Sequence, residues 1–291
     1  MDSEPMHMGF ANFEEWERFN ATYTVFVERY PAIEAMRDIV FSRQLVGEVI
    51  DRVVFGLGWL CFEDWQEITV LCGNGFGIGA LKLLRGMYER QVTASYLSQH
   101  PNEVDDFMDF DFVQRRKGLN NLRRLYDGDD LNRIISAQRQ DEIEQEYRRV
   151  KTGGRFTDTL CQPCNRTRDT MSWTNLSMPD LAQRGGQGLD RFYFPLYNKP
   201  TLLGHPSLYS LVARIRDNAD GPGFAFDAEG QRSQVAEALA HAHFLLLHVF
   251  ATQINHFQLG AEEQLNALLE DYKACWHQEQ PSTDADVERR L

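Results

Sequence analysis

Arg85 and Glu89 have the residue types and the spacing to do chemistry. They lie four positions apart, which places them on neighbouring turns of a helix. Apolar side chains recur beside them at steps of three and four residues: Leu81, Leu84, Tyr88 and Val92. This stripe predicts a buried helix that carries a partly buried ion pair. The guanidinium of Arg85 could hold a phosphate or a carboxylate by two hydrogen bonds, or the pair could only fix the register of the helix.

Cys161 and Cys164 have the spacing of half a zinc site. A closed structural site needs four ligands, and the sequence has no second C-x-x-C. Cys275 and His277 could complete the set only by a long-range approach. We therefore expect an exposed or half-exposed pair of cysteines without stoichiometric zinc.

His241 and His248 are seven residues apart on one predicted helix, which separates them by about 10.5 Å along its axis. That separation is too great for one metal ion. His243 and His256 have no acidic partner at ligand spacing. All four histidines are therefore expected in the core or on a helix surface, and no metal or cofactor is expected.

A glycine-rich run follows the apolar segment Ile68–Cys72. Gly75, Gly77 and Ala80 match the G-x-G-x-x-A turn that binds dinucleotides after a strand. The helical period that continues unbroken from Leu81 to Tyr96 leaves no room for the second strand that such a unit needs. We therefore prefer glycines that allow close helix packing or start a helix, and keep nucleotide binding at Gly73–Gly79 as an alternative.

The 291-residue chain has a net charge of −13, which argues against non-specific binding to nucleic acid. Residues 111–168 are an exception, because thirteen basic side chains there exceed nine acidic ones. This segment is thus +4 and the rest −17. Mixed salt bridges on helix faces are the preferred explanation.

Five cysteines and an acidic start, Met1-Asp2-Ser3-Glu4, predict a cytoplasmic protein. The apolar run Val235–Phe250 is interrupted by Glu237 and by histidines. It predicts a buried helix and no membrane span.

Helical periods dominate the chain and predict an all-α protein, a multi-helix bundle that is at least half helix and has no sheet of four or more strands. The expected organisation, within one compact unit, has three parts. They are an N-terminal helical hairpin at 1–60, a helical core at 61–257 with an irregular loop at 153–176, and a C-terminal helix and tail at 258–291. Pro31 is expected to end the first helix or to start the second.

Residues 62–212 resemble one bacterial family of all-helical proteins whose function is unknown. The resemblance rests on the run G-I-G-A-L-K-L-L-R-G-M-Y-E-R at Gly77–Arg90, on Cys161-x-x-Cys164 followed by Ser172-Trp173, and on Tyr197 followed by Leu203-Gly204-His205-Pro206. It implies a helical bundle. The arrangement is more distantly similar to HEPN ribonuclease domains, which cut RNA with an Arg followed four to six residues later by His near a dimer interface.

The HEPN resemblance implies a HEPN-like core with extra helices at both ends and a polar site formed by Arg85, Glu89, Tyr197 and His205. The Arg-His spacing itself is absent, since Asn198, Lys199 and Pro200 stand ahead of His205. The implied function is an RNA-directed, defence-associated effector, with RNA or a partner protein as ligand, that forms a homo-oligomer. The alternative is a non-catalytic helical interaction protein in which the same four residues form a satisfied buried network.

Overall fold

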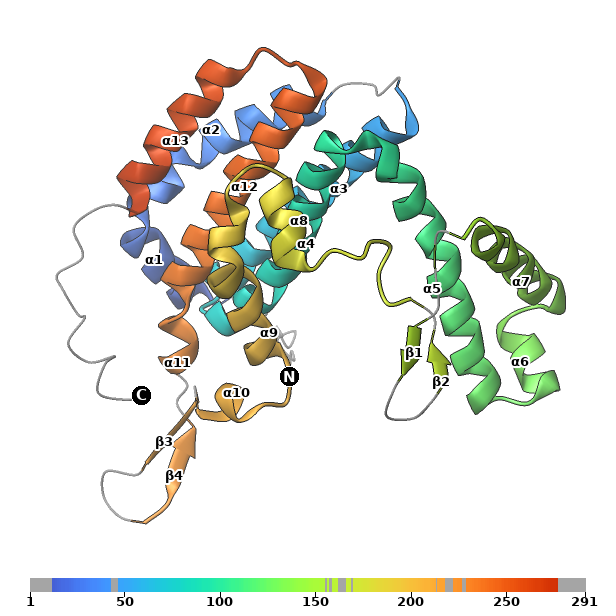
Figure 1. Ribbon diagram of the computed structural model, residues 1–291. Coiled ribbons are helices and arrows are strands. Elements are labelled where there is room, and N and C mark those ends of the chain that lie inside the picture. Colours follow the sequence, from blue (N-terminus) through green and yellow to red (C-terminus); the bar gives the residue numbers. More distant parts are fainter. Residues whose placement is uncertain are drawn as a thin grey trace, which may run out of the picture. The chain divides into compact units, whose positions relative to one another are not determined.

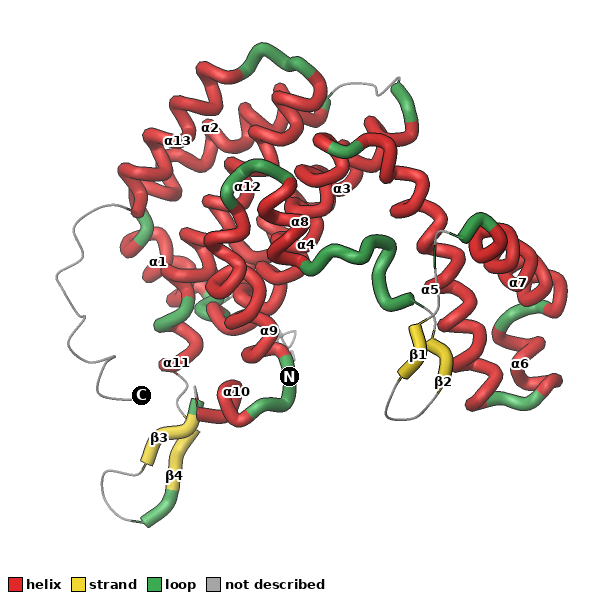
Figure 2. The backbone as a smooth tube through the Cα atoms, viewed as in Figure 1, coloured by secondary structure: helices red, strands yellow, loops and turns green. Residues whose placement is uncertain are grey.

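The computed structural model describes residues 12–42, 47–154, 156, 159–161, 166–168, 170–212, 214–217, 222–226 and 229–276. Helices account for most of these residues, and the strands among them form two short antiparallel pairs (Figures 1 and 2). The predicted all-α class is therefore confirmed. The chain divides into two units, Met1–Gln99 with Met178–Leu291 and, between them in sequence, His100–Ser177.

The first unit contains most of the helices. In chain order its elements are α1 (Phe13–Thr22), α2 (Thr24–Phe41), α3 (Val49–Gly73), α4 (Gly77–Gln99), α8 (Met178–Arg184), the 3-10 helix η2 (Leu189–Phe192), the π-helical turn η3 (Phe194–Asn198), α9 (Lys199–Gly204), α10 (Leu208–Val212), β3 (Ile215–Asp217), β4 (Phe224–Phe226), α11 (Glu229–Arg232), α12 (Val235–Phe257) and α13 (Glu262–Trp276).

The centre of the first unit is a three-helix packing of α3, α4 and α12 (Figure 1). Trp65 of α3, Tyr88 of α4 and Phe250 of α12 are fully buried in it. Gly58 lets α3 approach α12 closely, because a Cβ there would lie 2.2 Å from the side-chain amide of Gln253. That amide donates a 2.8 Å hydrogen bond to the carbonyl of Val54 and so ties the two helices together.

By length and composition α12 is apolar enough to cross a membrane. In this structure most of its apolar stretch is buried against α3 and α4, as the sequence predicted for a core helix. Burial here means contact with other helices of the same unit, so the apolar composition of α12 is accounted for by packing.

The N-terminal helices break at positions other than those predicted. Pro31 lies inside α2, and the break between the first two helices falls at Tyr23. The second helix of the hairpin expected at 1–60 is likewise split, because α2 ends at Phe41 and α3 begins at Val49. A capping box explains that start: the Asp51 carboxylate accepts from the backbone N–H of Glu48 at 2.9 Å, and the Glu48 side chain caps the first turn in return.

The second unit contains the 3-10 helix η1 (Pro101–Glu103), α5 (Val104–Leu125), α6 (Gly128–Ile134), α7 (Ala137–Thr152), β1 (Thr159–Cys161) and β2 (Arg166–Arg168). Helices α5 and α7 pack together around a small core of Phe110, Val113, Val150 and Phe156. Asp127 and Ser136 cap α6 and α7 by accepting from backbone N–H groups. Residues 128–152 therefore form two helices, and the second ends just before the segment 153–176 that was expected to be irregular.

The segment 153–176, expected to be irregular, contains the β1–β2 pair, in which Thr159 pairs with Arg168 and Cys161 with Arg166. The units also differ from the predicted division. Helix α3 crosses the boundary expected at residue 60. Residues 100–177, which were expected to belong to the helical core at 61–257, form a unit of their own. Within a run of amphipathic helices, sequence periodicity does not say which helix packs on which.

Candidate functional site

Helix α4 positions Arg85 and Glu89. The apolar stripe beside them is fully buried, as predicted, at Leu81, Leu84, Tyr88 and Val92. The pair itself lies at the edge of this stripe, with 34% of the Arg85 side chain and 37% of the Glu89 side chain exposed. It is therefore a half-buried pair on a rigid core helix.

Glu89 and Tyr197 hold the Arg85 guanidinium. Nε and Nη2 of Arg85 donate to Glu89 Oε1 at 3.2 and 3.0 Å. Nη2 also lies 3.4 Å from the hydroxyl of Tyr197, and the guanidinium carbon is 4.9 Å from the centre of the Tyr197 ring. The other terminal nitrogen, Nη1, makes no hydrogen bond to the described residues. One edge of the guanidinium thus remains available to a ligand.

Partial burial disfavours the charged form of Arg85, but the hydrogen bonds and the charge of Glu89 outweigh this effect and raise the pKa of the guanidinium. The pKa of the Tyr197 hydroxyl is raised as well, mainly because the ring is partly buried. At neutral pH the site therefore consists of a guanidinium cation beside a neutral phenol.

The π-helical turn η3 places Tyr197 beside α4, although Tyr197 lies 112 residues after Arg85 in the sequence. Its ring stacks on Tyr193 with centres 5.0 Å apart and planes at 23°. It also lies 6.1 Å from the ring of Tyr88, whose hydroxyl donates to the carbonyl of Leu189 at 3.0 Å. Tyr88 is therefore a buried support that links α4 to η2 and so fixes where Tyr197 can lie.

His205 follows the last residue of α9, and its side chain is exposed. Its neighbour Gly204 lies against α4, since a Cβ on Gly204 would be 3.9 Å from Cγ of Lys82. Lys82 precedes Arg85 by about one helical turn. The structure thus brings Arg85, Glu89 and Tyr197 into contact, whereas no hydrogen bond or ion pair joins His205 to them among the described residues.

Lys199, the basic residue ahead of His205 in sequence, is not free to act in place of an arginine. Its ammonium group pairs with the Glu237 carboxylate of α12. The pair also influences His241, one turn further along α12. Burial lowers the pKa of His241, while Glu237 raises it and Lys199 lowers it.

Two residues at the site were not identified from the sequence: Tyr193 and Lys82. Tyr193 is the more instructive, because its spacing of four residues from Tyr197 is a helical signal. Lys82 lies three positions before Arg85 on α4, which is also a helical spacing, but its approach to Gly204 depends on the packing of α9 on α4.

The glycine run forms the turn that connects α3 to α4. Ile68–Cys72 lies inside α3, so the strand that a dinucleotide-binding turn requires is absent from these residues. A Cβ on Gly73 would lie 2.4 Å from the Trp16 ring, and one on Gly77 would lie 2.5 Å from backbone atoms of Gln231 and Val235. These glycines permit close packing, which is the interpretation preferred from the sequence.

Of the two cysteines of the C-x-x-C pair, the structure describes only Cys161. Cys161 ends β1, and Cys164 and His277 lie outside the described residues. Within the described ranges, no three His, Cys, Asp or Glu side chains group as metal ligands would.

The fold and site define an all-α protein with a half-buried Arg–Glu–Tyr cluster on its central helix. The chain belongs to a family of unknown function, DUF5677, whose model matches residues 51–222. This range contains all four predicted site residues and confirms the expectation of an uncharacterised family. No curated protein and no solved structure matches the chain.

Proposed function

We propose that this protein is a HEPN-like helical effector that acts on RNA, with Arg85 as the residue that binds the phosphodiester. The observation that carries the proposal is the Arg85 guanidinium, which is held on one side by Glu89 and Tyr197 and whose Nη1 makes no hydrogen bond to any residue that the structure describes. A guanidinium fixed in this way suits the flat, forked contacts that a phosphate offers.

The chemistry proposed is transesterification within the RNA strand. The ribose 2′-hydroxyl attacks phosphorus, the bond from phosphorus to the 5′-oxygen breaks, and a cyclic phosphate forms. The proton leaves the 2′-oxygen, and another is given to the departing 5′-oxygen. Arg85 would stabilise the charge on the phosphoryl oxygens, and the exposed His205 side chain would transfer a proton.

The acidic balance of the chain bears on how RNA would bind. A net charge of −13 gives no general attraction for nucleic acid, so recognition has to depend on local groups such as Arg85 and Lys82. Loss of one phosphate contact should reduce the slope of log affinity against log salt concentration by about 1.

The test uses fluorescently labelled single-stranded RNA and four proteins: the natural chain, Arg85→Gln, His205→Ala and Arg37→Gln. Arg37 is a matched control, because it pairs with Glu34 on its own helix, lies 5.7 Å from the centre of the Phe62 ring and is 27% exposed. We expect Arg85→Gln and His205→Ala to lose cleavage while melting close to the natural chain, and Arg37→Gln to keep it. An intact chain that does not cleave RNA, or a His205→Ala variant with full activity, would contradict the proposal.

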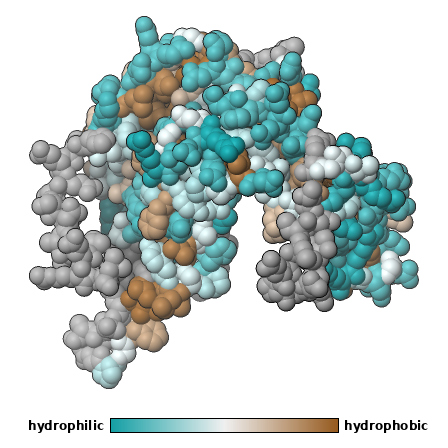
Figure 3. All heavy atoms as spheres, in the orientation of Figure 1, coloured by the Kyte–Doolittle hydropathy of each residue, from teal (hydrophilic) through white to brown (hydrophobic). Residues whose placement is uncertain are grey.

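A second candidate function, a non-catalytic interaction protein, is favoured by a different observation. Large apolar side chains are exposed on α10 and the β3–β4 hairpin: Leu208, Tyr209, Leu211, Val212, Phe224 and Phe226. These residues form the α10–hairpin patch. Figure 3 shows hydrophobic atoms exposed together over α10. Exposed apolar patches of this kind commonly mark sites of interaction with another protein. The occupant we propose is a second copy of the chain.

A further inference from the structure

A pocket lined by α1, α2 and α3 lies in the first unit and shares no residue with the Arg85 site. Four aromatic side chains line it, Trp16 and Phe19 from α1 and Phe26 and Tyr30 from α2, together with Thr69 from α3. We call it the α1–α3 pocket. Its volume is about 320 Å³, which lies within the roughly 300–1,000 Å³ range of small-molecule sites.

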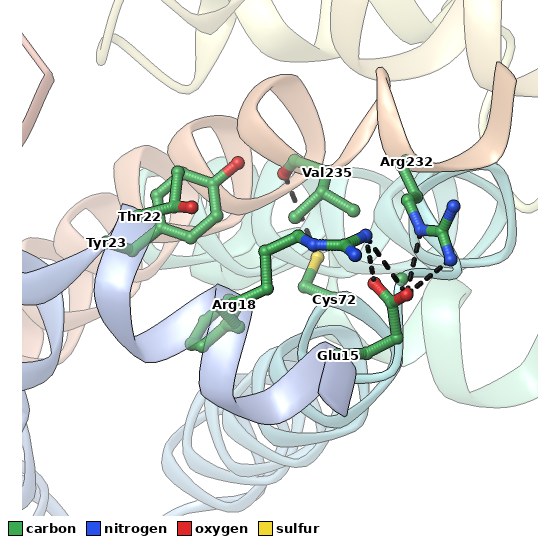
Figure 4. A pocket seen from close by; sticks show the side chains of 9 residues that line it. Glu15, Arg18, Thr22, Tyr23, Cys72, Arg232 and Val235 are labelled. Atoms are coloured by element: carbon green, nitrogen blue, oxygen red, sulfur yellow. Dashed lines mark hydrogen bonds and ion pairs between the residues drawn. The ribbon is translucent and has the colours of Figure 1, made fainter. Parts of the chain in front are cut away.

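Helix α1 is fastened to the rest of the unit beside this pocket. Figure 4 shows an adjoining pocket, where the Glu15 carboxylate lies between the guanidinium groups of Arg18 and Arg232. Arg232 comes from α11, and its Nε donates to Glu15 Oε1 at 2.9 Å. One residue further along α1, the Trp16 ring lies so close to α3 that a Cβ on Gly73 would be 2.4 Å from it. These contacts fix the position of Trp16, so the α1–α3 pocket does not need a ligand in order to form.

The four rings form a continuous series along the pocket. Trp16 and Phe19 have ring centres 5.5 Å apart, Phe19 and Phe26 6.3 Å, and Phe26 and Tyr30 6.5 Å, each pair in an edge-to-face arrangement. The two ends of the series, Trp16 and Tyr30, make no ring contact with each other in the part of the chain that the structure describes. Because both line the pocket, a flat ring placed between them can contact both.

The polarity of the lining selects against charge. Among the described residues that line the pocket, none is charged. Thr69 is the buried polar group, with 9% of the residue exposed. Its hydroxyl donates to the carbonyl of Trp65 at 2.9 Å, so its hydrogen is used and its oxygen can only accept a bond from a ligand. An anion would lose hydration here without gaining a cation, whereas a neutral ligand with one donor would satisfy Thr69.

We propose that the α1–α3 pocket binds a small, neutral, planar aromatic molecule that carries one N–H or O–H donor. The ring system lies between Trp16 and Tyr30, and the donor bonds to Oγ1 of Thr69. An apolar cavity of about 150 Å³ is enough for benzene, so about 320 Å³ has room for two fused rings. A nucleotide is not a ligand of this pocket, because its phosphates would have no cation to bind.

The experiment uses isothermal calorimetry at pH 7 with three two-ring probes. Indole is neutral and has an N–H donor. Benzofuran has the same shape, with an oxygen in place of the N–H group, and indole-2-carboxylate is an anion. We expect indole to bind with a Kd below about 1 mM, benzofuran to bind about two- to tenfold more weakly, and indole-2-carboxylate at least about tenfold more weakly.

Two variants locate the site. Thr69→Val keeps the size of the side chain but removes the acceptor, so indole should bind only as tightly as benzofuran, whose affinity should change little. Val27→Trp should abolish indole binding, because Val27 lines the pocket and is 37% exposed, so a larger side chain there can fill the opening. Val49→Trp is the matched control, since Val49 is an exposed valine at the start of α3 and does not line the pocket. It should leave indole binding unchanged.

Each variant is checked by circular dichroism to be folded before titration. The substitutions change different helices, so a failure of one variant to fold leaves the other decisive. The proposal is overturned if indole does not bind the natural chain below about 1 mM, if indole-2-carboxylate binds as tightly as indole, or if folded Val27→Trp binds indole as the natural chain does. An unchanged preference for indole over benzofuran in folded Thr69→Val would overturn the assigned hydrogen bond and with it the ligand class.

Discussion

The Arg85–Glu89 pair contributes little to stability, and this allows function to be measured apart from folding. Ion pairs exposed to this degree are typically worth about 0–1 kcal/mol, whereas breaking a fully buried pair costs about 3–5 kcal/mol. With about a third of each side chain exposed, the pair is nearer to the first case. A loss of activity in an Arg85 variant would therefore report on the site itself.

His243 makes the stability of the protein depend on pH. Its ring is fully buried among Phe26, Tyr272 and Trp276, and this burial lowers its pKa from 6.5 to about 4. Above about pH 6.5 neither the folded nor the unfolded chain binds the proton. Below it only the unfolded chain does, so the free energy of unfolding falls as pH drops toward 4, by about 2 kcal/mol at pH 5.

Urea unfolding at pH 7 and pH 5 tests this prediction with His243→Gln, which removes the titrating group. The decrease in unfolding free energy between the two pH values should be about 2 kcal/mol smaller in the variant than in the natural chain. His248, whose pKa burial also lowers to about 4, continues to contribute in both proteins. His205→Gln, at an exposed position, serves as the control, and an unchanged pH dependence in His243→Gln would refute the assignment.

At the scale of elements, alanine substitutions at two glycines of α4 distinguish the effect of close packing from that of helix propensity. A Cβ on Gly77 would meet backbone atoms at 2.5 Å, which no side-chain rotation can relieve, so Gly77→Ala should cost about 1–3 kcal/mol. The nearest atom to a Cβ on Gly79 is 3.7 Å away, an ordinary contact. Gly79→Ala should instead gain up to about 1 kcal/mol from helix propensity. Thermal melts of the two variants should shift in opposite directions, and shifts of the same sign would contradict this.

The helices were predictable where an apolar stripe is regular, and not where packing overrides local signals. Periodicity identified α4 and α12 correctly. It failed at Pro31, because a helix can continue through proline when its flanking turns are held by burial, here at Phe26, Ile33 and Met36. It also failed at the boundary expected at residue 60, which lies inside α3, where Gly58 is required for close contact with Gln253.

The candidate site was predictable in part for a similar reason. Arg85 and Glu89 are neighbours on one helix, and local spacing predicts their contact. Tyr197 lies 112 residues further along the chain, so its contact with Arg85 depends on how η3 packs on α4. His205 was grouped with them through family resemblance, and the structure places it on the neighbouring helix end without a direct contact.

At the scale of the whole molecule, the α10–hairpin patch predicts self-association. Closed dimers with two-fold symmetry are the commonest way to bury one patch against its copy. Light scattering over a range of concentrations should give a mass approaching twice 33.7 kDa, and Leu208→Asp or Phe226→Asp should return it to 33.7 kDa. Phe13→Asp, which changes an equally exposed ring on α1, should leave the mass unchanged. A monomer at every concentration would exclude a homo-oligomer formed through this patch.

The insertion of residues 100–177 between α4 and the rest of the first unit has a consequence for synthesis. About 135 residues separate the end of α4 from the start of α12. At roughly 5–20 residues per second, a ribosome needs roughly 7–30 s to make them. During that interval the nascent α3 and α4 have no α12 to cover them, and chaperones can reach the apolar surface that it will bury. A ribosome that stalls before Val235 leaves Arg85 on a helix that can pack on α3 but has no α12 beside it.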